Sequence, residues 1–169
     1  MSYADRDGVI WMDGAMVPWR DANVHVLTHT LHYGVGAFEG IRAYKTPKGT
    51  AFFRLDDHLR RLYDTAHILG MDVPFESEVI REACIDSVRE NRLETAYVRP
   101  LVYYGSEGMG LHADNLSVHV SIAAWFWGAY LGADALERGI RIKTSSYTRH
   151  LVNSIMCRAK ACGNYINSI

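Results

Sequence analysis

Hydrophobic and polar residues repeat with two different periods along the first 126 residues of the chain. Short alternating or apolar segments bounded by turn residues predict strands at residues 9–12, 15–17, 24–27, 38–44, 50–54, 95–104 and 117–126. Apolar residues at every third or fourth position predict two helices, one from Asp56 or Asp57 to Gly70 and one from Ser77 to Arg92. This order predicts an α+β fold, an antiparallel sheet with two helices on one face.

The same periods predict which side chains form the core. In the strand 95–104 the core-facing residues are Ala96, Val98 and Val102. The inward stripe of the first helix is Leu59, Leu62, Tyr63, Ala66 and Leu69. The inward stripe of the second helix is Val79, Ile80, Ala83, Cys84 and Val88.

A change of pattern after residue 126 predicts a domain boundary. We expect residues 1–126 to form the α+β domain and the glycines near residue 130 to belong to a linker at 127–138. A strand is predicted at 139–145, as the start of a second, mainly β domain. One strand and the first turns of a helix cannot close a second core. Residues 139–169 are therefore expected to be the incomplete beginning of that domain.

Composition narrows the class of protein. The chain has 169 residues, 49% of them hydrophobic and 22% charged, with a net charge of −1. This is typical of globular proteins and gives no electrostatic reason to expect nucleic acid or a membrane as partner. The three cysteines are too few for a disulfide framework, and the polar N-terminus has no apolar signal segment. We expect a cytoplasmic protein with reduced thiols.

Lys160, between Ala159 and Ala161, is one of only four lysines. An amine in an apolar setting is more readily neutral, and a neutral lysine amine is the nucleophile that forms Schiff bases. A solvent-exposed lysine near a chain end is the competing interpretation.

Other residues suggest binding chemistry without deciding it. Tyr97 and Arg99 share the outer face of their strand and suit a carboxylate, although on these residues alone a solvated sheet face is the simpler interpretation. Arg61 lies on the helix face away from the main apolar stripe, where it either binds a phosphate or is simply solvated. Gly40 lies in a predicted strand beside Phe38, which is typical of a close approach or of a bulge.

Three histidines have the spacing of a helical metal site. His25, His29 and His32 would align on a helix, but no carboxylate or cysteine joins them, and Val24 and Val26 favour a strand. We therefore do not expect a metal site.

Several longer motifs, in this order, resemble the branched-chain amino acid aminotransferases, which are pyridoxal-phosphate enzymes of fold type IV. The similarity runs through the whole chain and is carried by residues 25–34, Phe38-Glu39-Gly40-Ile41-Arg42, Tyr97-Val98-Arg99-Pro100-Leu101, Gly108-Met109-Gly110, residues 127–132 and Arg158-Ala159-Lys160.

The resemblance implies roles for individual residues. Lys160 would bind pyridoxal 5′-phosphate covalently and move protons in catalysis, Arg61 would bind the cofactor phosphate, and Tyr165 would hydrogen-bond the ring hydroxyl oxygen. The substrate pocket would be lined by Phe38, Tyr97, Arg99 and Tyr130. Tyr33, Met109 and Leu111 would reach into the pocket of a neighbouring subunit. The histidines would have a structural role and bind no metal.

The implied reaction transfers the amino group of L-leucine, L-isoleucine or L-valine to 2-oxoglutarate in a homodimer or larger homo-oligomer. Members of the family are nearly twice as long, so we expect this chain to be a fragment with little or no activity alone. A D-amino acid aminotransferase, an aminodeoxychorismate lyase and a non-catalytic dimerisation module remain alternatives. The 127–132 segment and the Tyr97–Arg99 strand favour the branched-chain group.

Overall fold

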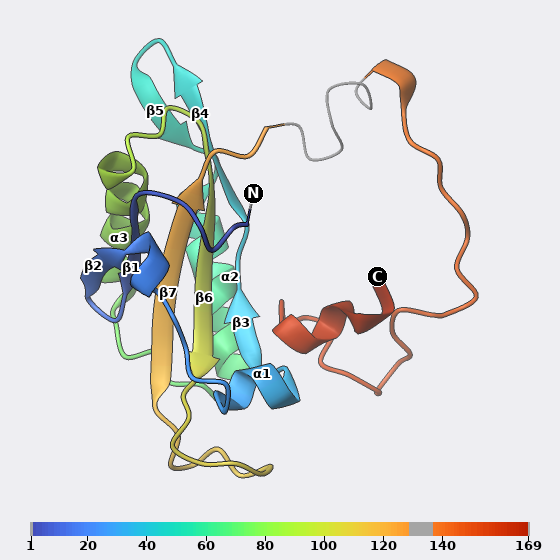
Figure 1. Ribbon diagram of the computed structural model, residues 1–169. Coiled ribbons are helices and arrows are strands. Elements are labelled where there is room, and N and C mark those ends of the chain that lie inside the picture. Colours follow the sequence, from blue (N-terminus) through green and yellow to red (C-terminus); the bar gives the residue numbers. More distant parts are fainter. Residues whose placement is uncertain (1, 129–136, 169) are drawn as a thin grey trace.

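A computed structural model describes residues 2–128 and 137–168, and its main feature is one antiparallel sheet (Figure 1). The strands are β1 (Val9–Met12), β2 (Ala15–Pro18), β3 (Gly36–Phe38), β4 (Ile41–Thr46), β5 (Gly49–Phe52), β6 (Ala96–Tyr104) and β7 (Val118–Trp125). Their order is β2-β1-β7-β6-β4-β5, and β3 also pairs with β6. The longest register joins β6 to β7, from Tyr97 opposite Trp125 to Tyr104 opposite Val118.

Two long helices, α2 (Leu55–Ile68) and α3 (Ser77–Glu90), share one hydrophobic core with the sheet. Val98 and Val102 of β6 are fully buried in this core, as their alternation predicts. Burial of a valine or isoleucine side chain contributes roughly 1.5–3 kcal/mol, so this layer is the main source of stability. The predicted α+β fold is confirmed. Shorter helices are α1 (His29–Tyr33), η1 (Trp19–Asp21) and η2 (Cys162–Ser168).

The helix boundaries and stripes differ slightly from the prediction. Arg54, in a left-handed conformation (φ 55°), precedes α2, so the helix begins at Leu55 and not at an aspartate cap. The α3 stripe is buried as expected except for Val79, which is 46% exposed. Val79 is one position before the buried Ile80, about 100° around the helix, and this rotation carries it off the core face.

One predicted strand is wrong and another is interrupted. Residues 24–27 form no strand; the Thr28 N–H donates to the His25 carbonyl at 2.9 Å, which closes a turn over 25–28 that leads directly into α1. The predicted 38–44 strand is interrupted at Glu39 and Gly40, which separate β3 from β4.

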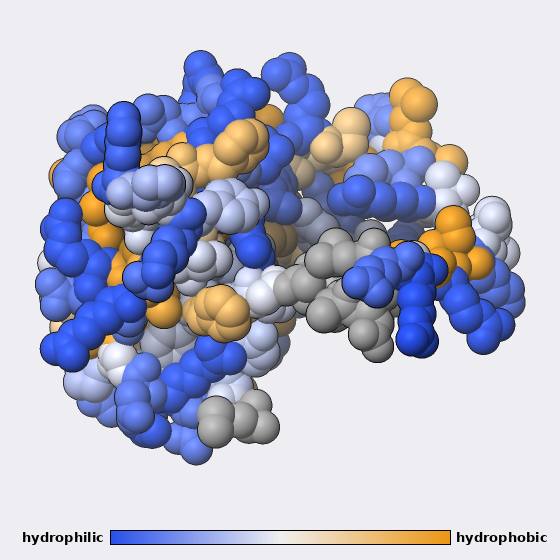
Figure 2. All heavy atoms as spheres, turned by 90° about the horizontal axis from the view of Figure 1, so that it is seen from above, coloured by the Kyte–Doolittle hydropathy of each residue, from blue (hydrophilic) through white to orange (hydrophobic). Residues whose placement is uncertain are grey.

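The segment after residue 136 is an extended arm that leaves the sheet and returns to it (Figure 1). The predicted strand at 139–145 is absent there, because the described residues offer it no partner strand. Figure 2 shows exposed hydrophobic residues over this arm; Ile142, Leu151 and Val152 are 69–100% exposed. Tyr130 and most of the predicted linker lie outside the described residues. Within the described part, no helix is both long and apolar enough to cross a membrane.

Candidate active site

The returning arm fixes the backbone of Lys160 between a strand and a helix. The Phe38 N–H of β3 donates to the Lys160 carbonyl at 3.3 Å, and the Lys160 N–H donates to Thr65 Oγ1 of α2 at 3.0 Å. A β-bridge between Ala37 and Ala161 adds a further connection. Both backbone polar groups of Lys160 are therefore held by the sheet domain.

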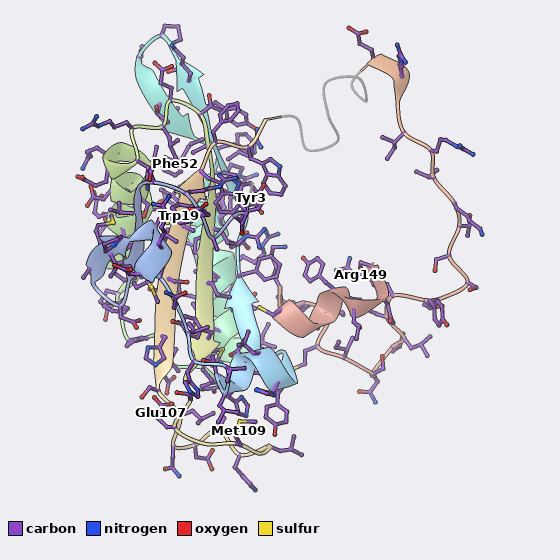
Figure 3. All side chains as sticks on the ribbon, viewed as in Figure 1. Tyr3, Trp19, Phe52, Glu107, Met109 and Arg149 are labelled. Atoms are coloured by element: carbon purple, nitrogen blue, oxygen red, sulfur yellow. The ribbon has the colours of Figure 1, made fainter. Side chains whose placement is uncertain are left out.

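The Lys160 side chain lies among aromatic groups. Its Nζ donates to the Tyr165 hydroxyl at 2.5 Å and lies 4.3 Å from the centroid of the Phe38 ring. Tyr165 belongs to η2, and its ring packs 5.3 Å from that of Phe38. Arg149, labelled in Figure 3, lies over the other aromatic partner, with Cζ 5.4 Å from the Tyr165 centroid. The Lys160 side chain is thus partly buried and has an aromatic partner on two sides.

Arg61 of α2, whose side chain is half-exposed, forms an ion pair with the buried carboxylate of Glu39. Arg61 Nε donates to Glu39 Oε1 at 2.5 Å and Nη2 donates to Oε2 at 2.8 Å, while His58 Nδ1 lies 2.8 Å from Oε2. Burial alone would raise the pKa of Glu39, but the hydrogen bonds from Arg61 and His58 outweigh it and lower that pKa. The Glu39 hydrogen bond raises the pKa of Arg61, and Tyr165 adds to this effect. Arg61 therefore lies within electrostatic reach of the Lys160–Tyr165 pair.

The sequence prediction missed Glu39. An acidic residue inside the apolar run Ala37-Phe38-Glu39-Gly40-Ile41 was the available signal, because a buried carboxylate requires a cationic or hydrogen-bonding partner.

Arg99, bonded to Tyr97, is the second cationic group of the site, after Arg61. Arg99 Nη2 donates to the Tyr97 hydroxyl at 2.8 Å, and the guanidinium lies 4.8 Å from the Phe38 centroid. The buried Arg99 Nε has no hydrogen-bond partner among the described residues. A half-buried guanidinium with an unused donor can bind a carboxylate.

An aromatic wall continues from Tyr97 along the sheet. Its ring lies 5.1 Å from that of Trp125 and 4.6 Å from that of Trp127. Arg42 Nη1 donates to the Trp127 carbonyl at 2.9 Å, which fixes the end of this wall. At Gly40 an added Cβ would lie 2.1 Å from the Tyr97 hydroxyl oxygen. The group that approaches Gly40 is thus the Tyr97 side chain, not a ligand or another backbone, and Gly40 lies between β3 and β4 and not inside a strand.

Met109, labelled in Figure 3, and Leu111 belong to the loop between β6 and β7, and Tyr33 is the last residue of α1. The Gly110 N–H donates to the Tyr33 hydroxyl at 3.0 Å, and Met109 and Leu111 are 49% and 88% exposed. This hydrogen bond joins Tyr33 to the loop that carries Met109 and Leu111.

The three histidines each contact backbone groups. His29 Nε2 lies 2.8 Å from the Gly110 carbonyl, and His32 Nε2 lies 2.9 Å from the Val26 carbonyl. The Leu27 N–H donates to His25 Nδ1 at 3.1 Å. No group of three metal-binding side chains is found in the described ranges.

Comparison with known proteins gives consistent matches. Residues 36–169 match the family model described as amino-transferase class IV. The chain is 64% identical over 169 residues to a branched-chain-amino-acid aminotransferase of Pseudomonas aeruginosa, covering all of this chain and 55% of that protein. It is 48% identical over 161 residues to the Escherichia coli K12 enzyme of the same name, covering 95% of this chain and 52% of that protein.

Solved structures agree with the sequence relatives. A crystal structure of the Escherichia coli branched-chain amino acid aminotransferase superposes with a TM-score of 0.93 at 48% identity, covering 96% of this chain and 54% of that one. The branched-chain aminotransferase of the archaeon Thermoproteus uzoniensis, solved with norvaline, gives 0.88 at 37% identity, with 96% and 54% covered. The chain thus spans about half the length of the relatives that it matches, and it belongs to the class IV aminotransferase family.

Proposed function

We propose that this chain carries the catalytic lysine of a branched-chain amino acid aminotransferase, which moves the amino group of L-leucine, L-isoleucine or L-valine to 2-oxoglutarate. The observation that carries the proposal is the contact of Lys160 Nζ with the Tyr165 hydroxyl over the Phe38 ring, which Arg99 also faces. The names of the relatives, at 64% and 48% identity, support this substrate class over the D-amino acid and lyase alternatives.

Pyridoxal phosphate is the proposed cofactor, and the donor set fits it. One similar solved structure is of a branched-chain amino acid aminotransferase with pyridoxamine 5′-phosphate, and another is complexed with N-(5′-phosphopyridoxyl)-L-glutamate. In this chain Lys160 offers an amine for the cofactor aldehyde, Arg61 a guanidinium for its phosphate, and Tyr165 a hydroxyl for its ring oxygen. Bound pyridoxal phosphate supplies an electron sink for the carbanion at the substrate α-carbon.

The residues of the chain then have separate tasks in the proposed mechanism. The Lys160 amine would take the proton from the substrate α-carbon as a base and deliver it to the cofactor as an acid, and the Tyr165 hydroxyl keeps Nζ in place. Arg99 and Tyr97 bind a substrate carboxylate, since together they offer a guanidinium and a phenol. Phe38 covers the apolar side of the pocket and excludes water.

The remaining assignments complete the proposal. Tyr130 is proposed as a further substrate-binding residue. Tyr33, Met109 and Leu111 are proposed to enter the pocket of a neighbouring subunit in a homo-oligomer. Residues 1–126, 127–138 and 139–169 are proposed as small domain, linker and start of the cofactor domain, in a cytoplasmic enzyme.

A spectroscopic titration tests the cofactor part of the proposal. Purified protein is titrated with pyridoxal 5′-phosphate while absorbance follows covalent attachment. We expect saturable attachment that Lys160→Ala abolishes and that Lys45→Ala, at an exposed lysine paired with Glu94, leaves intact. Attachment that survives Lys160→Ala would count against it. Turnover of L-leucine but not of D-alanine, measured on a chain of the relatives' full length, tests the substrate class. The 169 residues alone are expected to show little turnover.

A further inference from the structure

Glu39 is the only acidic residue that is buried among the described residues, and the mechanism above gives it no task. A carboxylate in such a place requires full pairing. Its Oε1 accepts from Arg61 Nε, and its Oε2 accepts from Arg61 Nη2 and the Gly40 N–H, with His58 Nδ1 2.8 Å away. Glu39 is thus the centre of a small polar network beneath the candidate site.

The interruption between β3 and β4 determines where the Glu39 carboxylate lies. The Glu39 N–H donates to the Pro100 carbonyl of β6 at 3.0 Å, so the backbone stays attached to the sheet although the strand is interrupted. The Glu39 side chain reaches α2, whereas the next residue, Gly40, faces the Tyr97 hydroxyl. Two adjacent residues therefore support the two arginines of the site: Glu39 holds Arg61, and Gly40 leaves room for Tyr97, the partner of Arg99.

The pair restricts a side chain that would otherwise be free to rotate. Arg61 is 52% exposed, and a long arginine at a half-exposed position loses considerable rotamer freedom when it is fixed. The two parallel hydrogen bonds occupy Nε and Nη2 and fix the guanidinium plane. The Nη1 donors stay outside this pair.

We propose that Glu39 is a positioning residue that orients Arg61 so that its remaining N–H donors bind the cofactor phosphate. The inference rests on the proposed function. The proposal can be separated from a simple charge effect, because Glu39 is an anion close to the proposed site of the cofactor phosphate, which is also an anion. Charge alone predicts that removing Glu39 tightens phosphate binding, whereas orientation predicts that it weakens it.

The test compares two ligands that differ only in the phosphate, pyridoxal 5′-phosphate and pyridoxal. Their dissociation constants are measured by the absorbance change on attachment, and the ratio of the two defines the phosphate preference. Both titrations use the same preparation, so an unfolded fraction cancels from the ratio. The variants are Glu39→Gln, which loses the charge, and Glu39→Asp, which keeps the charge but, because its side chain is one methylene shorter, holds it farther from Arg61. Glu94→Gln is the matched control, at an exposed ion pair with Lys45.

We expect both Glu39 variants to lower the phosphate preference at least about tenfold, the size of one lost charge-assisted hydrogen bond, and Glu94→Gln to keep it within about twofold. In an Arg61→Ala background, Glu39→Gln should change the preference no further. A preference that is kept or increased in Glu39→Gln would overturn the role of Glu39 and leave the proposed function standing. An unmodified protein that attaches neither ligand, or shows no preference, would overturn both.

Discussion

Lys160 and Phe38 are joined twice, by a backbone hydrogen bond of 3.3 Å and by the approach of the ammonium to 4.3 Å from the ring centroid. The backbone contact sets where the arm meets β3, and the cation–π contact sets where the amine points. The same ring also faces Arg99, so one aromatic side chain lies beneath two cations. This arrangement favours an anionic ligand over the ring.

The tether between Lys160 and α2 is open to a direct test. Thr65→Val removes the acceptor of the Lys160 N–H and leaves a buried donor unpaired, at a cost of about 1–3 kcal/mol. We expect amide hydrogen exchange at residues 159–161 to become roughly tenfold faster or more, because local opening becomes easier. Unchanged exchange at these residues would show that the hydrogen bond does not hold the arm.

Gly40→Ala should disturb the substrate-binding corner. The new Cβ would lie 2.1 Å from the Tyr97 hydroxyl oxygen, so the Tyr97 ring must move and its bond with Arg99 must break. Overpacking of this kind costs about 1–3 kcal/mol, measurable as a lower free energy of unfolding in urea. The matched control is Gly128→Ala, where the nearest side-chain atom of Phe126 is 3.9 Å away. Equal losses for both variants would contradict the predicted clash.

The low pKa of Glu39 predicts a specific dependence of stability on pH. Its value in the folded protein lies below the ordinary 4.5, so the carboxylate contributes stability that is complete above 4.5 and lost as the pH falls through the folded pKa. Glu39→Gln should therefore be less stable than the unmodified protein near pH 7, and the difference should shrink as the pH falls below 4.5 and through the lowered pKa of Glu39. Urea unfolding at several pH values measures this, and a difference that grows in acid would be the opposite result.

Burial predicts a large contrast in cysteine reactivity. The Cys84 side chain lies in the core, and desolvation raises the pKa of its thiol to about 12, so almost no thiolate exists at pH 8. Cys157 is exposed. Peptide mass spectrometry after brief alkylation at pH 8 should find Cys157 modified and Cys84 unmodified until the protein is denatured; prompt modification of native Cys84 would show that α3 is packed less tightly.

Periodicity predicted the elements that bury one face and failed where a strand depends on a distant partner. From Ala96 to Val102 the residues of β6 alternate between buried and half-buried because one side of the strand packs on the helices, and that signal is local. Residues 24–27 and 139–145 show the same β-branched pattern, but strands also need pairing partners, which single-sequence patterns do not reveal.

The sequence allowed several individual residues of the site to be predicted, but not the contacts between them. Arg61 was expected on the face of α2 away from the main apolar stripe, and in the structure it is bonded to Glu39; Thr65 of the same helix, which was not predicted as a site residue, is bonded to Lys160. Glu39 was missed because its partners are 19 and 22 residues away in sequence. The individual roles of Lys160 and Tyr165 came from the family resemblance, since neither spacing nor composition distinguishes them.

The most direct test of the central claim locates the cofactor on the chain. Protein incubated with pyridoxal 5′-phosphate is reduced with borohydride, which makes the attachment permanent, and is then digested and sequenced by mass spectrometry. The account predicts a phosphopyridoxyl group on Lys160 and not on the other three lysines, Lys45, Lys48 and Lys143. A group found mainly on one of those three, or equally on all four, would contradict it.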